Sequence, residues 1–304
     1  MNILNATYPS DIFDYFDLDS SYKKLAKQYH PDTVGSNESF IKLQELYTLA
    51  KEEMKKDFII SSTMIKLKDQ AFSFYSKHTF DCGFIYVGTK QVVYHFTLDY
   101  IKIGKSFFSS FKFKDSDMEK VFKPQVLYQH TTYETKEDYF IVISKDEKEF
   151  LLADVMVKDI PVETSVWIFN RLYSFGCYLN YLGLVNLDIS KYTVFLNLEN
   201  HVISVYGGWW HSATLTAKMK TMTLKTFNLL SVKAKTDKIA TIDIVADQIK
   251  SLMLEILKGK KIDSKYSNWL TLPSKLSIIE EYQEWDSVVL PKIFPVRKFY
   301  KWTI

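Results

Sequence analysis

Few residues of this 304-residue chain have the types and spacing that chemistry requires. Its two cysteines, Cys82 and Cys177, lie far apart and have no CxxC neighbour, so a structural zinc site would need further ligands. From residue 211 onward there is no cysteine and one histidine, His211, and no Ser-His or Cys-His nucleophile pair stands out. Two candidates remain: the tripeptide that begins at His30, and Asp188, whose carboxylate suits either a general base or a turn.

The overall composition limits the class of protein. Lys and Arg number 39 against 36 Asp and Glu, and this net charge of +3 is too weak to favour a nucleic-acid or membrane partner. Nine glycines in the whole chain disfavour phosphate-cradling loops. The apolar stretch 162–185 contains charged and amide side chains, which indicates a buried helix and not a membrane span. No signal peptide pattern opens the chain, so we expect a cytoplasmic protein. The abundance of Lys, Ile, Tyr and Phe is typical of proteins from AT-rich genomes, including viral ones, and a viral protein would be expected in the host cytoplasm.

Two helices must position the first candidate. Residues 20–29 place apolar side chains on one face, Asp19 offers an N-cap oxygen, and Pro31 ends the helix. A loop containing Gly35 follows, and a second helix begins near Glu38. The pattern predicts an αα-hairpin. The apolar faces are Tyr22, Leu25, Ala26 and Tyr29 on the first helix, and Phe40, Leu43, Leu46, Tyr47 and Ala50 on the second.

The run YKKLAKQYHPD, followed by SFIKLQELYTLAKEE, resembles the J domain of DnaJ/Hsp40-type co-chaperones. In that family the tripeptide stimulates ATP hydrolysis by an Hsp70 partner of the DnaK type, and the basic face of the preceding helix contacts the partner's acidic patch. The resemblance therefore implies that His30, Pro31 and Asp32 are the trigger and that Lys23, Lys24 and Lys27 are docking charges. The alternatives are a stray loop histidine on a generic helical hairpin, and lysines that only form a solvated helix face.

The sequence departs from a full J domain in several places. The segment 12–16 (IFDYF) stands in for the family's first helix and lacks its usual glycine. No Gly/Phe-rich linker and no CxxCxGxG repeats follow, so the client-binding parts of larger family members are missing. Residues 1–57 carry seven lysines and ten acids, so the basic face is local.

The remainder predicts an α+β fold in two lobes, with domains at 1–60, 61–160 and 161–304. A connecting segment at 57–70 leads to a small antiparallel sheet with one helix packed on it. Its expected strands are 80–87 and 91–96, joined by 88–90, and a second pair, 139–144 and 149–155. Helical stretches are expected at 98–110 and 115–122. In the second lobe the three-to-four spacing of apolar residues predicts helices at 165–182, 224–230, 236–257 and 277–286.

The run LGLVNLDISKYTVFLNLENHVISVYGGWW is similar to the catalytic loop and metal-binding hairpin of protein-kinase-like folds. Asp188 falls where that family has its catalytic aspartate. Asn186 replaces the expected histidine, Thr193 replaces a magnesium-binding asparagine, and Tyr206 replaces the magnesium-binding aspartate. No GxGxxG and no VAIK-type lysine precede them. Because phosphoryl transfer depends on those metal ligands, we expect a kinase-like scaffold without kinase chemistry, metal or cofactor, in which Asp188 forms a turn.

After Tyr206 come Gly207, Gly208, Trp209 and Trp210. Adjacent glycines let the backbone turn, and the tryptophans either anchor the core, which burial habits favour, or form an interaction surface. The combination of a J-like N-terminus with this run also resembles a group of bacteriophage and bacterial hypothetical proteins described as DnaJ-like.

Three hypotheses follow. The leading one is a J-domain co-chaperone or adaptor that recruits and stimulates an Hsp70, with a catalytically dead kinase-like body that binds a client or partner protein. The second is an atypical kinase or nucleotide-binding enzyme that uses Asp188. The third is a structural or inhibitory interaction protein, in which His30 is buried against the body.

Overall fold

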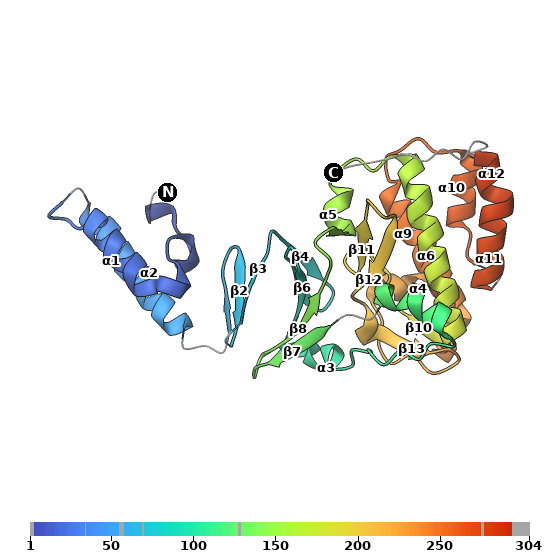
Figure 1. Cartoon of the computed structure of the whole chain (residues 1–304), viewed down its shortest axis with the longest axis horizontal. Coiled ribbons are helices and arrows are strands. Elements are labelled where there is room, and N and C mark those ends of the chain that lie inside the picture. The colour runs from blue at the N-terminus through green and yellow to red at the C-terminus, as the bar shows by residue number, and fades with distance from the viewer. Residues whose placement is uncertain are drawn as a thin grey trace. The chain divides into compact units, whose positions relative to one another are not determined.

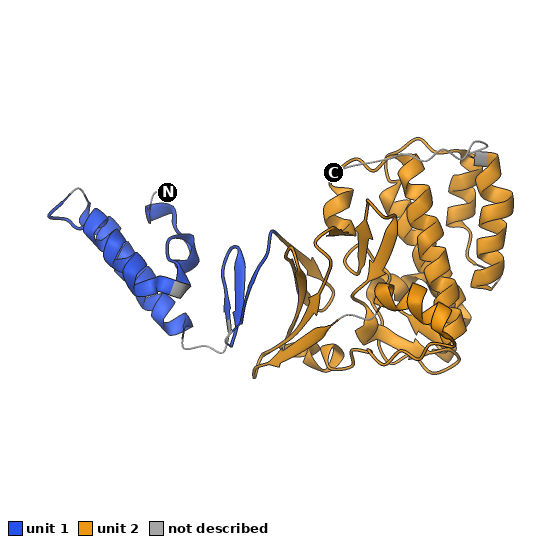
Figure 2. Cartoon of the chain, in the orientation of Figure 1, with its two compact units in different colours: residues 1–75 blue, residues 76–304 orange. Residues whose placement is uncertain are grey.

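The structure is a computed structural model that describes residues 3–33, 35–54, 58–68, 70–126, 129–274 and 277–293. The chain forms two compact units, Met1–Tyr75 and Ser76–Ile304 (Figure 2), so the first division falls later than the boundary expected at residue 60. The fold class is α+β, with N-terminal helices, an antiparallel sheet and a helical C-terminal region (Figure 1). Within the described ranges, no helix is long and apolar enough to cross a membrane.

Unit 1 is built on two helices, α1 (Leu18–Tyr29) and α2 (Asn37–Glu53), close to the ranges that the apolar spacing predicted. Ser36 caps α2, because its hydroxyl accepts a hydrogen bond from the Ser39 amide at 3.1 Å. Tyr22 of α1 stacks on Tyr47 of α2, with ring centroids 3.9 Å apart. Asp19, expected to cap α1, instead accepts a hydrogen bond from the Tyr47 hydroxyl at 2.5 Å. The hairpin is therefore held by side chains of both helices.

Two other parts of unit 1 differ from expectation. In place of a first helix there are three short 3-10 turns, η1 (Ile3–Asn5), η2 (Pro9–Asp11) and η3 (Tyr15–Asp17). Ile3 of η1 and Tyr15 of η3 belong to the same small core as α2. The segment interpreted as a connection instead begins an antiparallel meander. Its strands are too short to show an alternating pattern: β1 (Phe58–Ile60), β2 (Met64–Leu67) and β3 (Gln70–Ser73).

Unit 2 begins with a five-stranded antiparallel sheet in the order β4-β5-β6-β8-β7. The hairpin of β5 and β6 through residues 88–90 is confirmed, since Val87 pairs with Val92. Between β6 and β7 the chain forms the short elements η4 (Leu98–Tyr100) and α3 (Ile101–Gly104), and then helix α4 (Ser116–Val126). The strands are β4 (Ser76–Phe80), β5 (Gly83–Val87), β6 (Gln91–Thr97), β7 (His130–Glu134) and β8 (Asp138–Ser144).

Three predictions for this sheet were wrong. The strand expected at 80–87 is broken by a turn at Asp81 and Cys82, after which Gly83 has φ +149° and no room for a Cβ beside the His95 carbonyl. The segment 139–144 pairs with β6 and β7 and not with 149–155. That second segment divides into β9 (Glu149–Leu151), which pairs with β11, and helix α5 (Leu152–Met156). The helix expected at 98–110 ends at Gly104.

The second half of unit 2 is mainly helical. The long helix α6 (Val162–Leu182) is confirmed and ends at Gly183, which has φ +67°. Four short strands follow, β10 (Leu184–Asn186), β11 (Val194–Asn197), β12 (Val202–Val205) and β13 (Ser212–Thr214). Strand β10 pairs with β13, and β11 pairs with β12 on one side and with β9 on the other. The last helices are α7 (Leu224–Leu229), α8 (Val232–Asp237), α9 (Asp243–Ile256), α10 (Ser264–Thr271), α11 (Ile278–Glu284) and α12 (Leu290–Ile293), with the π-helical turn η6 (Trp285–Val289) before α12.

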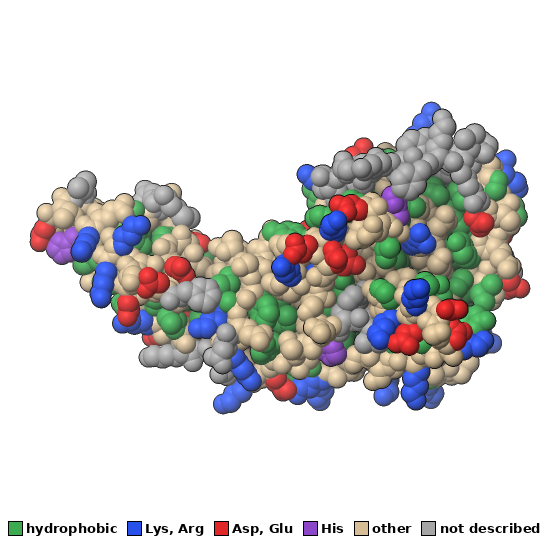
Figure 3. Space-filling model, in the orientation of Figure 1, with side chains coloured by type: hydrophobic (Ala, Val, Ile, Leu, Met, Phe, Trp, Pro, Cys, Tyr) green, Lys and Arg blue, Asp and Glu red, His purple; other side chains and the backbone are tan. Residues whose placement is uncertain are grey.

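The helix expected at 236–257 begins only at Asp243, because Ala240 and Ile239 form extended contacts with residues 216–218. The core of this region surrounds α6, whose Ile168, Leu172 and Phe175 are fully buried. On the face shown in Figure 3, acidic and basic side chains are interspersed over the helical part of unit 2 and do not gather by sign.

Because unit 1 has its own small core, its stability can be tested separately. Leu43 on α2 is fully buried, whereas Leu49 on the same helix is 48% exposed. We expect Leu43→Ala to lower the free energy of unfolding by about 2–5 kcal/mol and Leu49→Ala by less than about 1 kcal/mol. All six tryptophans lie in unit 2, so urea unfolding followed by circular dichroism and by tryptophan fluorescence separates the units. If Leu43→Ala destabilised only the transition seen by tryptophan fluorescence, Leu43 would not belong to a separate core of unit 1.

Candidate functional site

The first candidate site is the loop that joins α1 and α2. His30 follows the last residue of α1 in extended conformation, with ψ 137°. Its Nδ1 accepts a hydrogen bond from the Asp32 amide at 3.2 Å and lies 3.5 Å from the Asp32 carboxylate. Its ring meets Phe40 of α2 edge-on, with centroids 5.0 Å apart. The ring is thus oriented by both neighbours, while its side chain stays 45% exposed and that of Asp32 89% exposed.

The same loop is braced through its backbone. The Thr33 hydroxyl donates to the carbonyl oxygen of His30 at 2.8 Å and to that of Lys27 at 3.2 Å. Gly35 passes so close to the Tyr29 carbonyl that a Cβ would clash with it. On α1 itself, Lys23, Lys24 and Lys27 are exposed, and the apolar face with Tyr22 and Leu25 packs toward the core of unit 1. The predicted separation of a basic face from an apolar face is present.

The second candidate site is the loop between β10 and β11, which carries Asp188. Its shape is maintained by short polar bonds: the Asn186 Oδ1 accepts from the Asp188 amide at 2.9 Å, and the Thr193 hydroxyl donates to the Asp188 carbonyl at 2.8 Å. Thr193 Oγ1 also accepts from the Ser190 amide at 2.9 Å. Asn186 and Thr193, the two residues that depart from the kinase pattern, therefore stabilise the turn that presents Asp188.

Helices α7 and α9 hold this loop from the other side. Gln248 of α9 donates from Nε2 to the Asn186 carbonyl and accepts at Oε1 from the Ile189 amide, both at 2.9 Å. The Thr226 hydroxyl of α7 lies 2.7 Å from the Leu187 carbonyl, to which it donates. All of these groups are buried, so each satisfies a backbone atom that water does not reach.

Tyr206, where a metal-binding aspartate was expected, points into the core. Its hydroxyl and that of Ser204 each donate a hydrogen bond to the carboxylate of Glu149, which is 6% exposed. Its ring packs against Phe195 at 4.7 Å between centroids. The phenol therefore joins the residue after β12 to Glu149 of β9. In the described parts of the chain no group of three or more His, Cys, Asp or Glu side chains is arranged to hold a metal ion.

An aromatic cluster fills the space between the sheet and this loop. Trp210 lies 5.5 Å from Phe80, 4.9 Å from Tyr94 and 5.0 Å from Phe96, measured between ring centroids. Strand β6 carries no lysine, and the hydroxyl of its Tyr94 donates to the Tyr192 carbonyl at 3.0 Å.

The tryptophans themselves are core residues. Trp209 and Trp210 are 1% and 2% exposed, and Trp209 donates from Nε1 to the Val205 carbonyl at 2.8 Å. The interpretation of them as an interaction surface is therefore wrong, since neither presents area to a partner. The adjacent glycines have structural reasons: a Cβ on Gly207 would lie 2.6 Å from the Tyr94 hydroxyl, and Gly208 has φ +81° against the Asp188 carbonyl.

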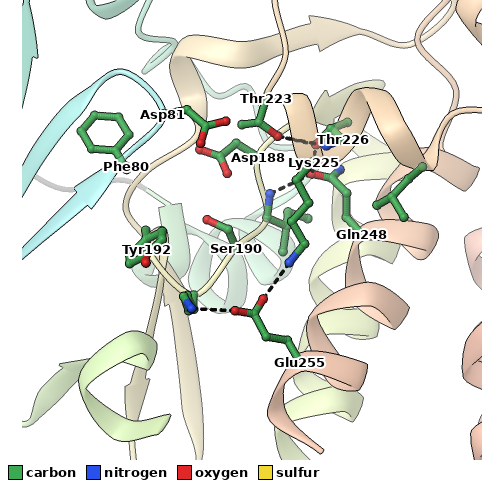
Figure 4. A pocket seen from close by; sticks show the side chains of 13 residues that line it. Phe80, Asp81, Asp188, Ser190, Tyr192, Thr223, Lys225, Thr226, Gln248 and Glu255 are labelled. Carbon is green, nitrogen blue, oxygen red and sulfur yellow. Dashed lines mark hydrogen bonds and ion pairs between the residues drawn. The ribbon is translucent and has the colours of Figure 1, made fainter. Parts of the chain in front are cut away.

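Beside the aromatic cluster a cavity of about 190 Å³ remains (Figure 4). It is lined by the turn after β4 with Asp81, by the loop with Asp188, and by helices α7 and α9. Figure 4 shows the Asp81 and Asp188 carboxylates facing each other, while Lys225 points to Glu255, which Lys191 also contacts. Those two lysines form ion pairs with Glu255 at 2.7 and 2.8 Å.

Burial controls the charge state of Asp188, which is 7% exposed. Loss of hydration raises the pKa of its carboxyl to about 7, the neighbouring Asp81 adds to the rise, and the Ser190 hydroxyl and Lys225 oppose it. The expected turn-forming role of Asp188 is consistent with its backbone bonds, but its side chain also faces the cavity.

The sequence patterns did not predict four residues of this site: Asp81, Lys191, Lys225 and Glu255. The turn at Asp81 had one signal, the glycine at position 83 inside an otherwise apolar run. The Glu255 ion pairs had none, because they join residues far apart in the chain.

A Cys-His pair was also not foreseen: Cys82 Sγ lies 3.9 Å from His211 Nε2, and both residues are buried. Burial raises the pKa of the Cys82 thiol to about 12 and lowers that of His211 to about 4, so the pair holds no thiolate at neutral pH.

Comparison with known proteins shows a distant structural likeness and no sequence match. No protein-family model and no curated protein matches the chain. Among solved structures, the chain is similar to the crystal structure of the BubR1 kinase domain, with a TM-score of 0.47 and 10% sequence identity over 92% of this chain and 95% of that one.

The raised pKa of Asp188 makes stability depend on pH. Between the usual carboxyl pKa of 3.8 and about 7 the folded protein retains a proton that the unfolded chain has lost, so this group's contribution to stability falls as pH rises. We expect Asp188→Asn to gain stability relative to the unsubstituted protein over this range, by at most about 1.4 kcal/mol per pH unit. Urea unfolding at several pH values, with Asp99→Asn as the exposed control, measures it. A difference that stays constant with pH would contradict the shift.

The approach of Gly208 to the Asp188 carbonyl gives a second prediction. Gly208→Ala would combine a positive φ with a clash against backbone, whereas Gly183→Ala has a positive φ and no atom within 4 Å. We expect the Gly183 substitution to cost about 1–2 kcal/mol of unfolding free energy and the Gly208 substitution clearly more, as measured by urea unfolding. Equal losses of unfolding free energy in the two variants would contradict a steric conflict between residue 208 and the Asp188 carbonyl.

Proposed function

We propose that this protein is a J-type co-chaperone or adaptor that recruits an Hsp70 through unit 1. The observation that carries the proposal is the oriented, solvent-accessible tripeptide of His30, Pro31 and Asp32, at the end of a helix with an exposed lysine face. A histidine that only stabilised a helical hairpin would gain from burial. Here its ring is fixed by Phe40 and Asp32 and yet nearly half exposed.

The geometry of α1 supports a docking role for its lysines. Lys23, Lys24 and Lys27 are exposed, and the ion pairs found in the described residues include none of them. Their charges are therefore free to meet an acidic surface, and such attraction accelerates encounter more than it tightens the final complex. Steering of this kind weakens with added salt.

For the kinase-like body we propose a role in binding a partner or client protein without phosphoryl transfer. Three features support it: the Tyr206 hydroxyl is bonded to Glu149, aromatic rings fill the space between the sheet and the Asp188 loop, and β6 has no lysine. Phosphoryl transfer depends on metal ions and cations that neutralise phosphate charge, and these positions supply none.

A second candidate function, an atypical enzyme that uses Asp188, has one observation in its favour. A carboxyl with a pKa of about 7 that faces a cavity is suited to acid–base chemistry. The cavity of about 190 Å³ is smaller than the roughly 300–1,000 Å³ of most ligand pockets. A thermal-shift scan with ATP and Mg²⁺ or Mn²⁺ discriminates, because a ligand of the folded state raises the melting temperature and a flat scan counts against it.

Hsp70 stimulation tests the leading proposal. We expect the full chain to raise the steady-state ATPase rate of a DnaK-type Hsp70, and His30→Gln to reduce the rate to that of Hsp70 alone. Replacing Lys23 and Lys24 by Glu should raise the concentration of this protein that gives half-maximal stimulation by roughly 5- to 30-fold, because about 1–2 kcal/mol of electrostatic attraction is lost. Reversing Lys102 and Lys136, which are exposed in unit 2, makes the same change in net charge and should leave stimulation intact. Equal stimulation by the His30 variant would sink the proposal.

A further inference from the structure

We propose that the cavity beside Asp188 is a binding site for a primary alkylammonium group, in which the Asp81 and Asp188 carboxylates hold the cation. The site is independent of the α1–α2 loop, which belongs to the other unit. It is built from four elements of unit 2: the turn after β4, the loop after β10, helix α7 and helix α9.

The two carboxylates are placed at different depths. Asp81 is exposed, at the tip of the β4–β5 hairpin, whereas Asp188 is 93% buried and lines the cavity with its side chain (Figure 4). Among the described residues no lysine, arginine or histidine forms an ion pair with either of them. The Ser190 hydroxyl is a hydrogen-bond donor to Asp188 but brings no charge. A buried carboxylate without a cation is costly, and a bound cation offsets that cost.

The other charges of the lining are already satisfied. Lys191 and Lys225 both bind Glu255, so their positive charges are matched there. The lining thus holds three carboxyl groups against two ammonium groups, and burial keeps a proton on Asp188 below about pH 7. An anion such as phosphate would meet the negative charge of Asp81 and further disfavour the ionised form of Asp188, whereas a cation would favour that form and balance both carboxylates.

Size and wall chemistry restrict the cation. A volume of about 190 Å³ corresponds to roughly six water molecules at about 30 Å³ each, enough for a short alkyl chain with one polar head. The aromatic rings of Phe80 and Tyr192 also line the cavity. Aromatic faces attract ammonium groups, and apolar walls accommodate methylene groups. A primary ammonium has three N–H donors, which Asp81, Asp188 and the Thr223 hydroxyl can share.

A free alkylamine and the side chain of a lysine on another protein share this chemistry, and two probes distinguish them. The probes are n-butylammonium chloride and Nα-acetyl-lysine methylamide, each added to the full chain at matched ionic strength, with 1-butanol as the uncharged control. Thermal shift and titration calorimetry are the readouts, since a ligand of the folded state raises the melting temperature.

We expect n-butylammonium to stabilise the unsubstituted protein and the His30→Gln and Asp99→Asn variants, and 1-butanol to have no effect. Asp81→Asn and Asp188→Asn should each weaken binding at least about tenfold, because each removes a charge-assisted hydrogen bond. Leu229→Trp, which narrows the cavity without changing charge, should also weaken binding. Binding of the lysine derivative as well as the amine would identify a protein-borne lysine, and binding of the amine alone a free amine.

Three results would overturn the proposal. They are the absence of stabilisation by both ammonium probes, equal binding by the Asp81→Asn variant and the unsubstituted protein, or stabilisation by Mg²⁺ with none by the ammonium probes, which would make the cavity a metal site. The His30→Gln variant separates this site from the proposed Hsp70 function, since it should lose ATPase stimulation and keep ammonium binding.

Discussion

The side-chain amide of Gln248 determines the geometry of unit 2 around its candidate site. By bonding the Asn186 carbonyl and the Ile189 amide, it ties the loop of Asp188 to α9, and the Thr226 hydroxyl adds a bond to Leu187. The loop has no regular secondary structure to satisfy its backbone, so these buried side chains do so. Because the loop is fixed, the Asp188 carboxylate is held against the cavity in spite of the cost of burial.

The residues around the Asp188 loop determine how much open space lies beside it and which charges line that space. The phenol of Tyr206 joins β12 to the buried Glu149, and Trp210 packs among Phe80, Tyr94 and Phe96. Aromatic rings therefore fill the space between the sheet and the Asp188 loop. What remains open is a small cavity lined by the carboxyl groups of Asp81, Asp188 and Glu255, where we propose that a cation binds.

Local patterns in the sequence predicted much of the fold, and contacts between distant residues limited the rest. Helices α1, α2 and α6 follow from apolar spacing, the β5–β6 hairpin follows from a short loop between apolar runs, and the β11–β12 hairpin follows from the resemblance to the kinase metal-binding hairpin. The partner of β9 could not be predicted in this way, because β11 lies far along the chain. The same reason hid the Glu255 ion pairs and the approach of Asp81 to Asp188. The tripeptide at His30 was visible because it is contiguous, although the exposure of its ring needed the structure.

The central claim is that an Hsp70 docks on α1 and the loop after it. Hydrogen–deuterium exchange of the full chain, with and without an ATP-bound DnaK-type Hsp70, tests this most directly. The account predicts slower exchange in peptides that cover residues 18–33, and little change in peptides of the sheet β4–β8 or of helices α6 and α9. Unchanged exchange at residues 18–33, or protection confined to unit 2, would contradict it.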